Sequence, residues 1–202
     1  MAADLGAWAP WTPDEVFSRM SAPSHPVLWW ISGGHAIDLF VGRPTRPHRD
    51  IDVSILRASA TRLRPRFPGW DLRIAHAGSL LPWSGLDPIP APYNGLWCRR
   101  TSGQPWRLQV MLEDGTAERW ICRRHPDLAV PMDQAILKNR DEVPYMAPQI
   151  QLFMKAKGTR PKEDDDFNVA RPLLSRVQDA WLARALQAYY PTHPWLLKMD
   201  QA

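Results

Sequence analysis

The sequence is poor in cysteine and has no long apolar run. Its two cysteines, Cys98 and Cys122, show neither metal-ligand spacing nor a disulfide framework, and we expect both to be core thiols. No apolar stretch approaches the roughly 18 residues of a membrane span. The N-terminus lacks the basic start and apolar run of a signal peptide, and no Lys and Arg cluster is dense enough for a nucleic-acid-binding arm. We therefore expect a soluble cytoplasmic protein.

Proline and tryptophan are abundant instead. The 21 prolines predict short, interrupted helices and strands, and the 11 tryptophans predict a core or a cleft built with large rings. A length of 202 residues allows one large domain, or one domain with a small appendage. The net charge of +4 fits an anionic ligand such as a nucleotide, and fits ordinary solubility equally well.

Hydrophobic periodicity divides the chain into two parts. Residues 1–146 alternate between strand and helix patterns, and the middle strands resemble antiparallel hairpins added to a sheet. Residues 147–202 have helical periodicity. We predict helices at 13–20, 35–41, 58–67, 147–157, 162–174 and 176–189, strands at 27–31, 50–56, 70–75, 94–99, 106–113 and 119–123, and a loop at 78–93. This pattern predicts an α/β (α+β) sheet followed by a helical C-terminal region.

The first candidate site is the turn Ser32-Gly33-Gly34 between a predicted strand and a predicted helix. Glycine lets the backbone approach an anion closely, and the free amides of the helix start face that anion. Ser32 adds a hydroxyl donor. Gly-Gly turns are also common between strands and helices without a ligand, so the turn alone leaves both interpretations open.

The second candidate site is the pair Asp50 and Asp52 on the next predicted strand. Residues at i and i+2 of a strand project from the same face. Two carboxylates there repel each other unless a cation lies between them, and Mg²⁺ prefers carboxylates together with substrate phosphates. The alternative is a solvated strand face. If the two strands are neighbours, the glycine turn and the aspartates meet at one edge of the sheet.

These residues recur in an order that resembles a known family. The sequence carries Gly33-Gly34, Ala36-x-Asp38, Gly42-x-x-Thr45-Arg46-x-His48 and Asp50-x-Asp52. This series, within residues 28–56, resembles the signature of the DNA polymerase β-like nucleotidyltransferase superfamily. The nearest branch is the aminoglycoside 2''-adenylyltransferase-like group, alongside the lincosamide nucleotidyltransferases.

The resemblance implies a nucleotidyltransferase-fold mixed sheet that transfers a nucleoside monophosphate from ATP or another NTP to a hydroxyl group. By this resemblance Ser32, Gly33 and Gly34 hold the triphosphate, and Asp50 and Asp52 bind Mg²⁺. The implied partners are a nucleotide and a small-molecule acceptor, with an aminoglycoside-like antibiotic as one acceptor and antibiotic resistance as the implied role. Arg46 and His48 lie near the phosphates or brace their loop, and Asp38 bonds to that loop.

A second, weaker match runs from Lys155 to Phe167. Related proteins carry a Lys that reaches the triphosphate and acids that orient the basic residues. By this resemblance Lys155 or Lys157 contacts phosphate, and Asp166 is the bracing acid. The alternative is a solvated charge cluster at a helix start, where acids suit the helix dipole.

The third carboxylate of the superfamily is harder to place. We align its position with Gln109, whose amide could ligate Mg²⁺ through oxygen but cannot act as a base. Glu113 points to the same strand face, roughly 13 Å further along the strand, and substitutes only if the strand register differs from this alignment or the strand bends. Gln109 therefore places turnover in question.

Three functions follow from this pattern: a small-molecule nucleotidyltransferase, a nucleotide-binding protein with weak or lost catalysis, and a toxin-type nucleotidyltransferase acting on tRNA or protein. The third requires a continuous basic surface. The candidates for such a surface are Arg99, Arg100, Arg107, Arg119, Arg123 and Arg124. We favour the alternative that these arginines form a solvated sheet face, so nucleic acid is the less favoured partner.

Overall fold

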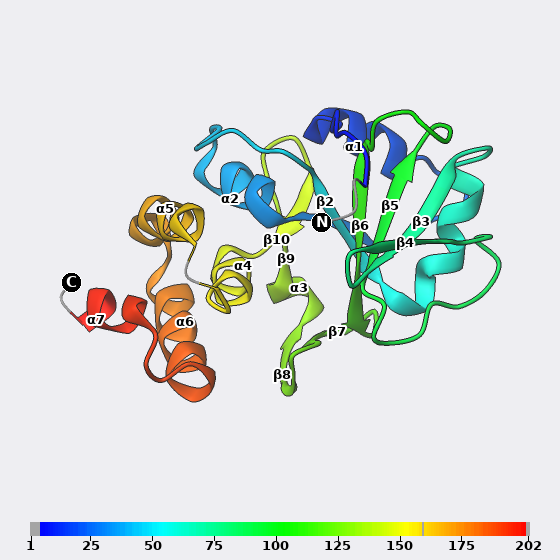
Figure 1. The fold of residues 1–202 in the computed structure, drawn as a ribbon. Helices are drawn as coiled ribbons and strands as arrows, with labels where there is room; N and C mark the ends of the chain where they lie inside the picture. The colour runs from blue at the N-terminus through cyan, green and yellow to red at the C-terminus, as the bar shows by residue number, and fades with distance from the viewer. Residues whose placement is uncertain (1–4, 159, 201–202) are drawn as a thin grey trace.

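A mixed sheet runs through the protein in a computed structural model that describes residues 5–158 and 160–200 (Figure 1). Its strands within these residues are β1 Trp29–Ser32, β2 Asp52–Leu56, β3 Asp71–His76, β4 Ser79–Pro82, β5 Gly95–Arg99, β6 Leu108–Gly115, β7 Arg119–Cys122, β8 His125–Pro131, β9 Ile136–Lys138 and β10 Pro144–Met146. They are ordered β4-β3-β5-β6-β2-β1-β10-β9, and β7 joins β6 to β8. The pairs β2/β6 and β1/β10 are parallel, and the other pairs are antiparallel.

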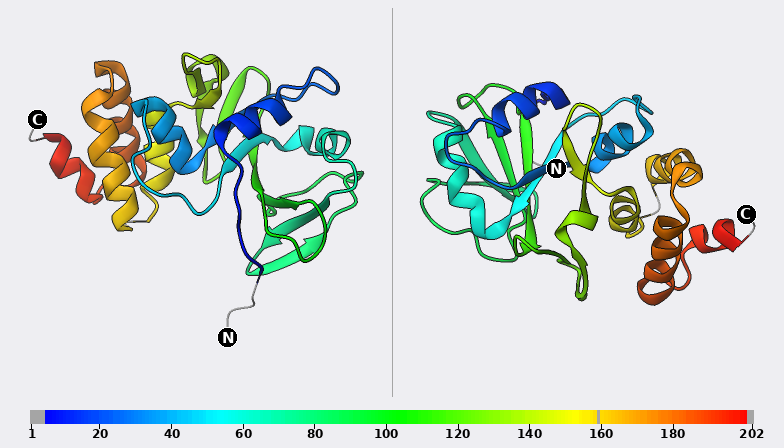
Figure 2. Two further views of the ribbon diagram at one scale, coloured as in Figure 1. Left: turned by 90° about the horizontal axis from the view of Figure 1, so that it is seen from above. Right: turned by 180° about the vertical axis from the view of Figure 1, so that it is seen from behind.

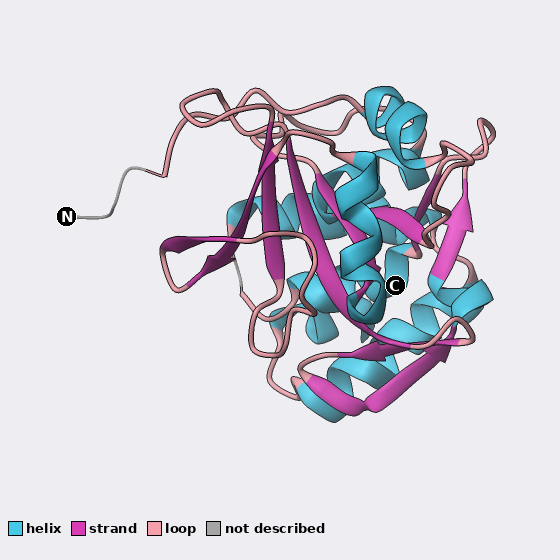
Figure 3. Cartoon of the chain, turned by 90° about the vertical axis from the view of Figure 1, so that its right-hand side faces the viewer, coloured by secondary structure: helices cyan, strands magenta, loops and turns pink. Residues whose placement is uncertain are grey.

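The helices gather mainly on one side of this sheet. They are α1 Pro13–Met20, α2 Gly33–Val41, α3 Met132–Ala135, α4 Pro148–Lys155, α5 Pro161–Ala170, α6 Arg176–Tyr189 and α7 Pro194–Asp200, with 3-10 helices η1 Arg57–Arg66 and η2 Arg171–Leu173. Helices α4 to α7 lie near α2 and away from β3 and β5, as two opposite views agree (Figures 1 and 2). Figure 3 views the molecule from the strand-rich side.

Local sequence signals set the ends of the first two helices. Thr12 caps α1, and its hydroxyl accepts a hydrogen bond from the amide of Glu15 while the Glu15 carboxylate accepts one from the Thr12 amide. Helix α2 ends at Gly42, which adopts a left-handed conformation with φ of 82°. Both ends agree with the sequence prediction, although α2 starts at Gly33 rather than at residue 35.

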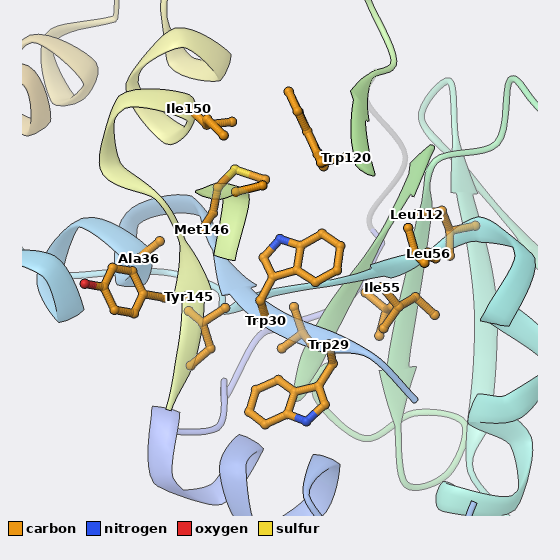
Figure 4. Close-up of a cluster of buried hydrophobic side chains, with 14 of the residues drawn as sticks. Trp29, Trp30, Ala36, Ile55, Leu56, Leu112, Trp120, Tyr145, Met146 and Ile150 are labelled. Carbon is orange, nitrogen blue, oxygen red and sulfur yellow. The ribbon is translucent and has the colours of Figure 1, made fainter. Parts of the chain in front are cut away.

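The core forms on both faces of the central strands. Trp29 and Trp30 are consecutive in β1 and point to opposite faces, and both are buried (Figure 4). Trp30 lies on the same side as Met146, Ile150 and Trp120 (Figure 4). This packing joins β1 to β10, its parallel neighbour, and to α4, so it holds β1 against the first of the C-terminal helices.

Several predicted elements differ from the structure. The region 78–93 contains an edge strand, β4, which pairs with β3 although its sequence is proline-rich. The helix predicted at 58–67 is a 3-10 helix with Pro65 inside it. Strand β2 begins at Asp52, so Asp50 lies outside it. Strands β8, β9 and β10 and helices α3 and α7 were not predicted, because short elements of this kind depend on distant partners rather than on local periodicity.

None of the helices within residues 5–158 and 160–200 combines the length and apolarity that crossing a bilayer requires.

Candidate active site

The end of β1 and the start of β2 bring the glycine turn against one of the aspartates. Ser32 and Asp52 are directly paired across the two antiparallel strands. Gly33 has a φ of 70°, and a Cβ atom at this position would overlap with the Asp52 carboxylate. Only glycine therefore fits both the backbone conformation and the space beside Asp52.

The environment of Asp52 favours a bound cation. Burial and the nearby negative charge of Asp50 raise the pKa of Asp52 to about 6, against the opposing charges of Lys155, Arg123 and Lys162. Asp50 itself is exposed and precedes β2. The two carboxylates are thus close enough to interact, but they do not share one strand face as the sequence predicted.

The loop between α2 and β2 is held by its own side chains. Asp38 Oδ1 accepts hydrogen bonds from the Thr45 amide at 3.0 Å and the Thr45 hydroxyl at 2.6 Å, and Asp38 Oδ2 lies 2.7 Å from His48 Nε2. Arg46 Nη1 lies 3.1 Å from His48 Nδ1. Because a guanidinium only donates, Nδ1 accepts and Nε2 carries the hydrogen. A Cβ atom on Gly34 would overlap with the His48 ring, so His48 and Arg46 brace this loop against α2.

His35 completes this cluster on α2. Its ring centroid lies 4.2 Å from that of His48, and chiefly burial lowers the pKa of His35 to about 4. Ligand atoms of His35, Asp38 and His48 lie within 4.8 Å of one another. Both His48 nitrogens are already bonded within the protein, so the group serves to order the loop.

A buried carboxylate ties this loop to the C-terminal helices. Asp166 is 1% exposed and accepts two hydrogen bonds from Arg46, at 2.9 and 3.0 Å. It also pairs with Lys155 Nζ at 2.8 Å. The contacts place Asp166 as the predicted bracing acid, while Lys157 is exposed. Thr159, within the same predicted motif, lies outside the described residues.

A cavity of about 650 Å³ opens over this region. One end is lined by Ser32, Gly33 and Asp52, and helix α4 contributes Gln151 and Lys155. The other lining residues include Asn94, Met111, Glu113, Arg123, Arg124, Met146, Met154, Lys157, Gly158, Arg160 and Glu163. The cavity therefore combines the glycine turn and the acid with cations from both parts of the chain.

Of the two candidates for the third carboxylate position, only Glu113 lines this cavity. Gln109 is paired in register with Asp52, as aligned from the sequence, but its Nε2 lies 3.0 Å from Met111 Sδ. Glu113 is 3% exposed and accepts a hydrogen bond from Trp120 Nε1 at 3.3 Å. The Ser54 hydroxyl lies 3.5 Å from Glu113 Oε1 and 2.9 Å from the Ser32 hydroxyl, which links Glu113 to the glycine turn.

Among the lining residues that were not identified from the sequence as part of the site, three make polar contacts that bear on the argument. Gln151 Oε1 accepts a hydrogen bond from the Gly33 amide at 2.8 Å. Arg123 and Arg124 form the turn between β7 and β8, and Arg124 Nη2 donates to the Met154 carbonyl at 2.6 Å. The prediction of a solvated face is wrong for these two arginines. Two consecutive arginines between strands were the available signal, but only the packing of the turn against α4 places them in the cavity.

Comparisons with known proteins identify a similar family and similar folds. The sequence model of the aminoglycoside-2''-adenylyltransferase family matches residues 15–68, which include the glycine turn and both aspartates. No curated protein matches the chain. The resemblance inferred from the motif order is therefore confirmed over this segment.

Solved structures extend the likeness to most of the chain. The crystal structure of ANT(2'')-Ia in complex with adenylyl-2''-tobramycin has a TM-score of 0.56 at 14% identity, covering 87% of this chain and 95% of that chain. The solution structure of ANT(2'')-Ia gives 0.57 at 17% identity, covering 93% and 94%. The lincomycin-bound structure of the lincosamide antibiotic adenylyltransferase LnuA gives 0.52 at 15% identity, covering 79% and 92%. The chain thus has the predicted nucleotidyltransferase fold with C-terminal helices.

Proposed function

We propose that this protein transfers a nucleoside monophosphate from a Mg²⁺-bound NTP to a hydroxyl group of a small molecule and releases pyrophosphate. The observation that carries the proposal is the close approach of Gly33 to Asp52 at one end of a cavity that Lys155 also lines. This arrangement offers a phosphate-binding turn, a carboxylate and a cation to one ligand. The family match over residues 15–68 supports the same reaction.

The phosphate contacts would come from both parts of the chain. Ser32, Gly33 and Gly34 provide the turn, and Lys155 and Lys157 provide positive charge. The Gly33 amide is bonded to Gln151 in the protein alone, so a phosphate oxygen would replace the Gln151 oxygen on this donor. Lys155 is oriented by Asp166, which also holds Arg46 and thereby the loop that carries His48.

The residues around Asp52 fit a magnesium ion. Carboxylate oxygens are the hard donors that Mg²⁺ prefers. Burial, and after it the charge of Asp50, raises the pKa of Asp52 to about 6, so a cation beside Asp52 would favour its ionised form. Asp50 and Asp52 would hold the ion. When bound, Mg²⁺ neutralises charge on the transferring phosphoryl group and on the leaving pyrophosphate.

The acceptor hydroxyl requires a group that receives its proton. Glu113 is the carboxylate of the cavity that is neither adjacent to Asp50 nor bonded through both oxygens to an arginine, and we assign it this role. Gln109 does not line the cavity, so it would affect the reaction only by positioning Asp52, with which it is paired across β2 and β6. The first acceptors to test are hydroxyl-bearing antibiotics, because the ANT(2'')-Ia and LnuA structures contain adenylyl-tobramycin and lincomycin.

The deciding experiment is calorimetric titration of ATP and GTP into the protein, first with Mg²⁺ and then with EDTA. We expect one nucleotide to bind in a metal-dependent manner, and Asp52→Asn to abolish that binding. Glu142→Gln is the matched control, because Glu142 is an exposed acid paired only with the exposed Lys138 in the described structure. Unchanged affinity in Asp52→Asn, or no nucleotide binding by the wild-type protein, would overturn the site assignment.

A toxin-type function on nucleic acid receives less support. The Arg99 guanidinium stacks over Trp106 at 4.0 Å and is bonded to Asp71. Arg123 and Arg124 line the cavity. These three arginines therefore do not contribute to a common exposed sheet face of the kind that a phosphate backbone would require.

A further inference from the structure

The turn between β7 and β8 holds buried, unpartnered cationic donors on two residues that line the cavity. Arg123 Nη1 and Arg124 Nε are buried and have no hydrogen-bond partner among the described residues. The Arg123 ion pair with Glu113 Oε1 is 3.9 Å long, beyond hydrogen-bond distance. Buried N–H groups are costly unless an acceptor reaches them. A ligand oxygen in the cavity would supply that acceptor.

Positive charge exceeds negative charge around the cavity. Its cationic lining residues are Arg123, Arg124, Lys155, Lys157 and Arg160, and its acidic ones are Asp52, Glu113 and Glu163. Both oxygens of Glu163 accept hydrogen bonds from Arg160. Asp52 is the metal ligand of the proposed function, and Glu113 is already bonded to Trp120. Among the described lining residues, Glu113 is therefore the one carboxylate left to face the several ammonium groups of a polyamine.

The arginine turn lies on the Glu113 side of the cavity. The Ser54 hydroxyl links the Glu113 carboxylate to the Ser32 hydroxyl, so this side adjoins the glycine turn within one cavity. Arg123 pairs with Glu113, the group assigned to the acceptor hydroxyl. The triphosphate has its own donors in the glycine turn and Lys155.

We propose that Arg123 and Arg124 form a subsite for an oxyanion on the acceptor, a carboxylate or a phosphate monoester. The acceptor is therefore a hydroxyl compound with negative charge, and a polycationic aminoglycoside is a poor one. This inference rests on the proposed function, because it assigns the acceptor of that reaction. The inferred acceptor differs from the ligands of the structural neighbours. Those ligands could be assigned to this chain only because the folds are similar.

The test uses the full chain saturated with Mg²⁺ and a non-hydrolysable ATP analogue. Four hexoses of similar size serve as probes in calorimetry: glucose, glucose 6-phosphate, glucuronate and glucosamine, with tobramycin as a fifth. We expect the two anions to bind at least roughly tenfold more tightly than the other three, as loss of charge-assisted hydrogen bonds would predict. The two anions also distinguish a phosphate subsite from a carboxylate subsite.

Substitutions in the arginine turn between β7 and β8 test whether that turn causes the preference for anionic probes. Arg123→Gln should remove it, with at least a tenfold loss of anion affinity, while Arg123→Lys should retain part of it. Lys138→Gln is the control, because Lys138 is exposed and does not line this cavity. Thermal melting of each variant reports folding, which matters because Arg124 also bonds to Met154; Arg123→Gln leaves that bond in place.

The outcomes separate this inference from the proposed function. Failure of the ATP analogue to bind would contradict the proposed function itself, and with it the acceptor assignment that rests on it. With the analogue bound, the absence of anion binding, tighter binding of tobramycin, or unchanged anion affinity in Arg123→Gln would each overturn the acceptor assignment alone. A loss of analogue affinity in Arg123→Gln, with anion binding intact, would place Arg123 on the triphosphate and also overturn it.

Discussion

Gly33 lies so close to Asp52 that a methyl group on the glycine would overlap with the aspartate carboxylate. The contact couples the backbone at the start of α2 to the first residue of β2. A substitution at Gly33 must therefore move either the glycine turn or the acid. Asp52 pairs directly with Ser32, the residue before Gly33, so neither the glycine nor the acid can shift without disturbing the pairing of β1 and β2.

Gly33→Ala should destabilise the protein and abolish metal-dependent nucleotide binding. The control is Gly42→Ala, because Gly42 has a similar positive φ of 82° but nothing within 4 Å of its added Cβ. We expect both to incur the left-handed penalty of about 1–2 kcal/mol, and Gly33→Ala to cost about 1–3 kcal/mol more through the clash. Urea unfolding and nucleotide titration measure the two effects. Equal effects of the two substitutions would contradict the contact.

Asp166→Asn should be strongly destabilising. The substitution leaves Lys155, 9% exposed, and Arg46, 18% exposed, without their shared carboxylate, and removal of one partner from a buried ion pair costs about 3–5 kcal/mol. Glu142→Gln breaks the exposed Lys138 pair instead and should cost at most about 0.5 kcal/mol. Chemical denaturation compares them, and a similar small effect of both would show that Asp166 does not brace the site.

Glu113→Gln should lower turnover without weakening nucleotide binding. Loss of a positioned general base typically reduces the rate by about 10²–10⁴-fold. Gln109→Ala should have the smaller effect, because the Gln109 amide contacts Met111 rather than lining the cavity. Pyrophosphate release with a saturating acceptor measures the rate. A larger loss in Gln109→Ala than in Glu113→Gln would reverse the assignment.

The stability of the protein should depend on pH through His35. Its pKa is lowered from 6.5 to about 4, chiefly by burial, so the unfolded chain binds the proton more readily than the folded chain. Stability from this group is complete above pH 6.5 and falls as the pH decreases toward 4, by up to about 3 kcal/mol. Urea unfolding at pH 7, 5.5 and 4 should show a shallower decrease in His35→Gln than in the wild-type protein. Parallel curves would show that His35 contributes nothing to the dependence.

Local chemistry determined much of the fold from the sequence. The Thr12 and Glu15 capping box, the start of a helix at the glycine turn and the left-handed stop at Gly42 depend on residues only a few positions apart. The order of the motifs from Gly33 to Asp52 was sufficient to indicate the fold, which the likeness to solved structures confirms. These features can be predicted from the sequence because each depends only on residues that are close together along the chain.

Only the tertiary structure decided the remainder. Strand β4 exists because β3 supplies its hydrogen bonds, and Gln151 reaches the Gly33 amide from 118 residues away. Glu113 and Arg123 share a cavity because β6, β7 and α4 pack together. Sequence periodicity reports which face of an element is buried, but not which distant element covers it. The glycine turn and its aspartates could therefore be proposed as a site from the sequence, whereas the grouping of Glu113 with Arg123 and Arg124 required the folded chain.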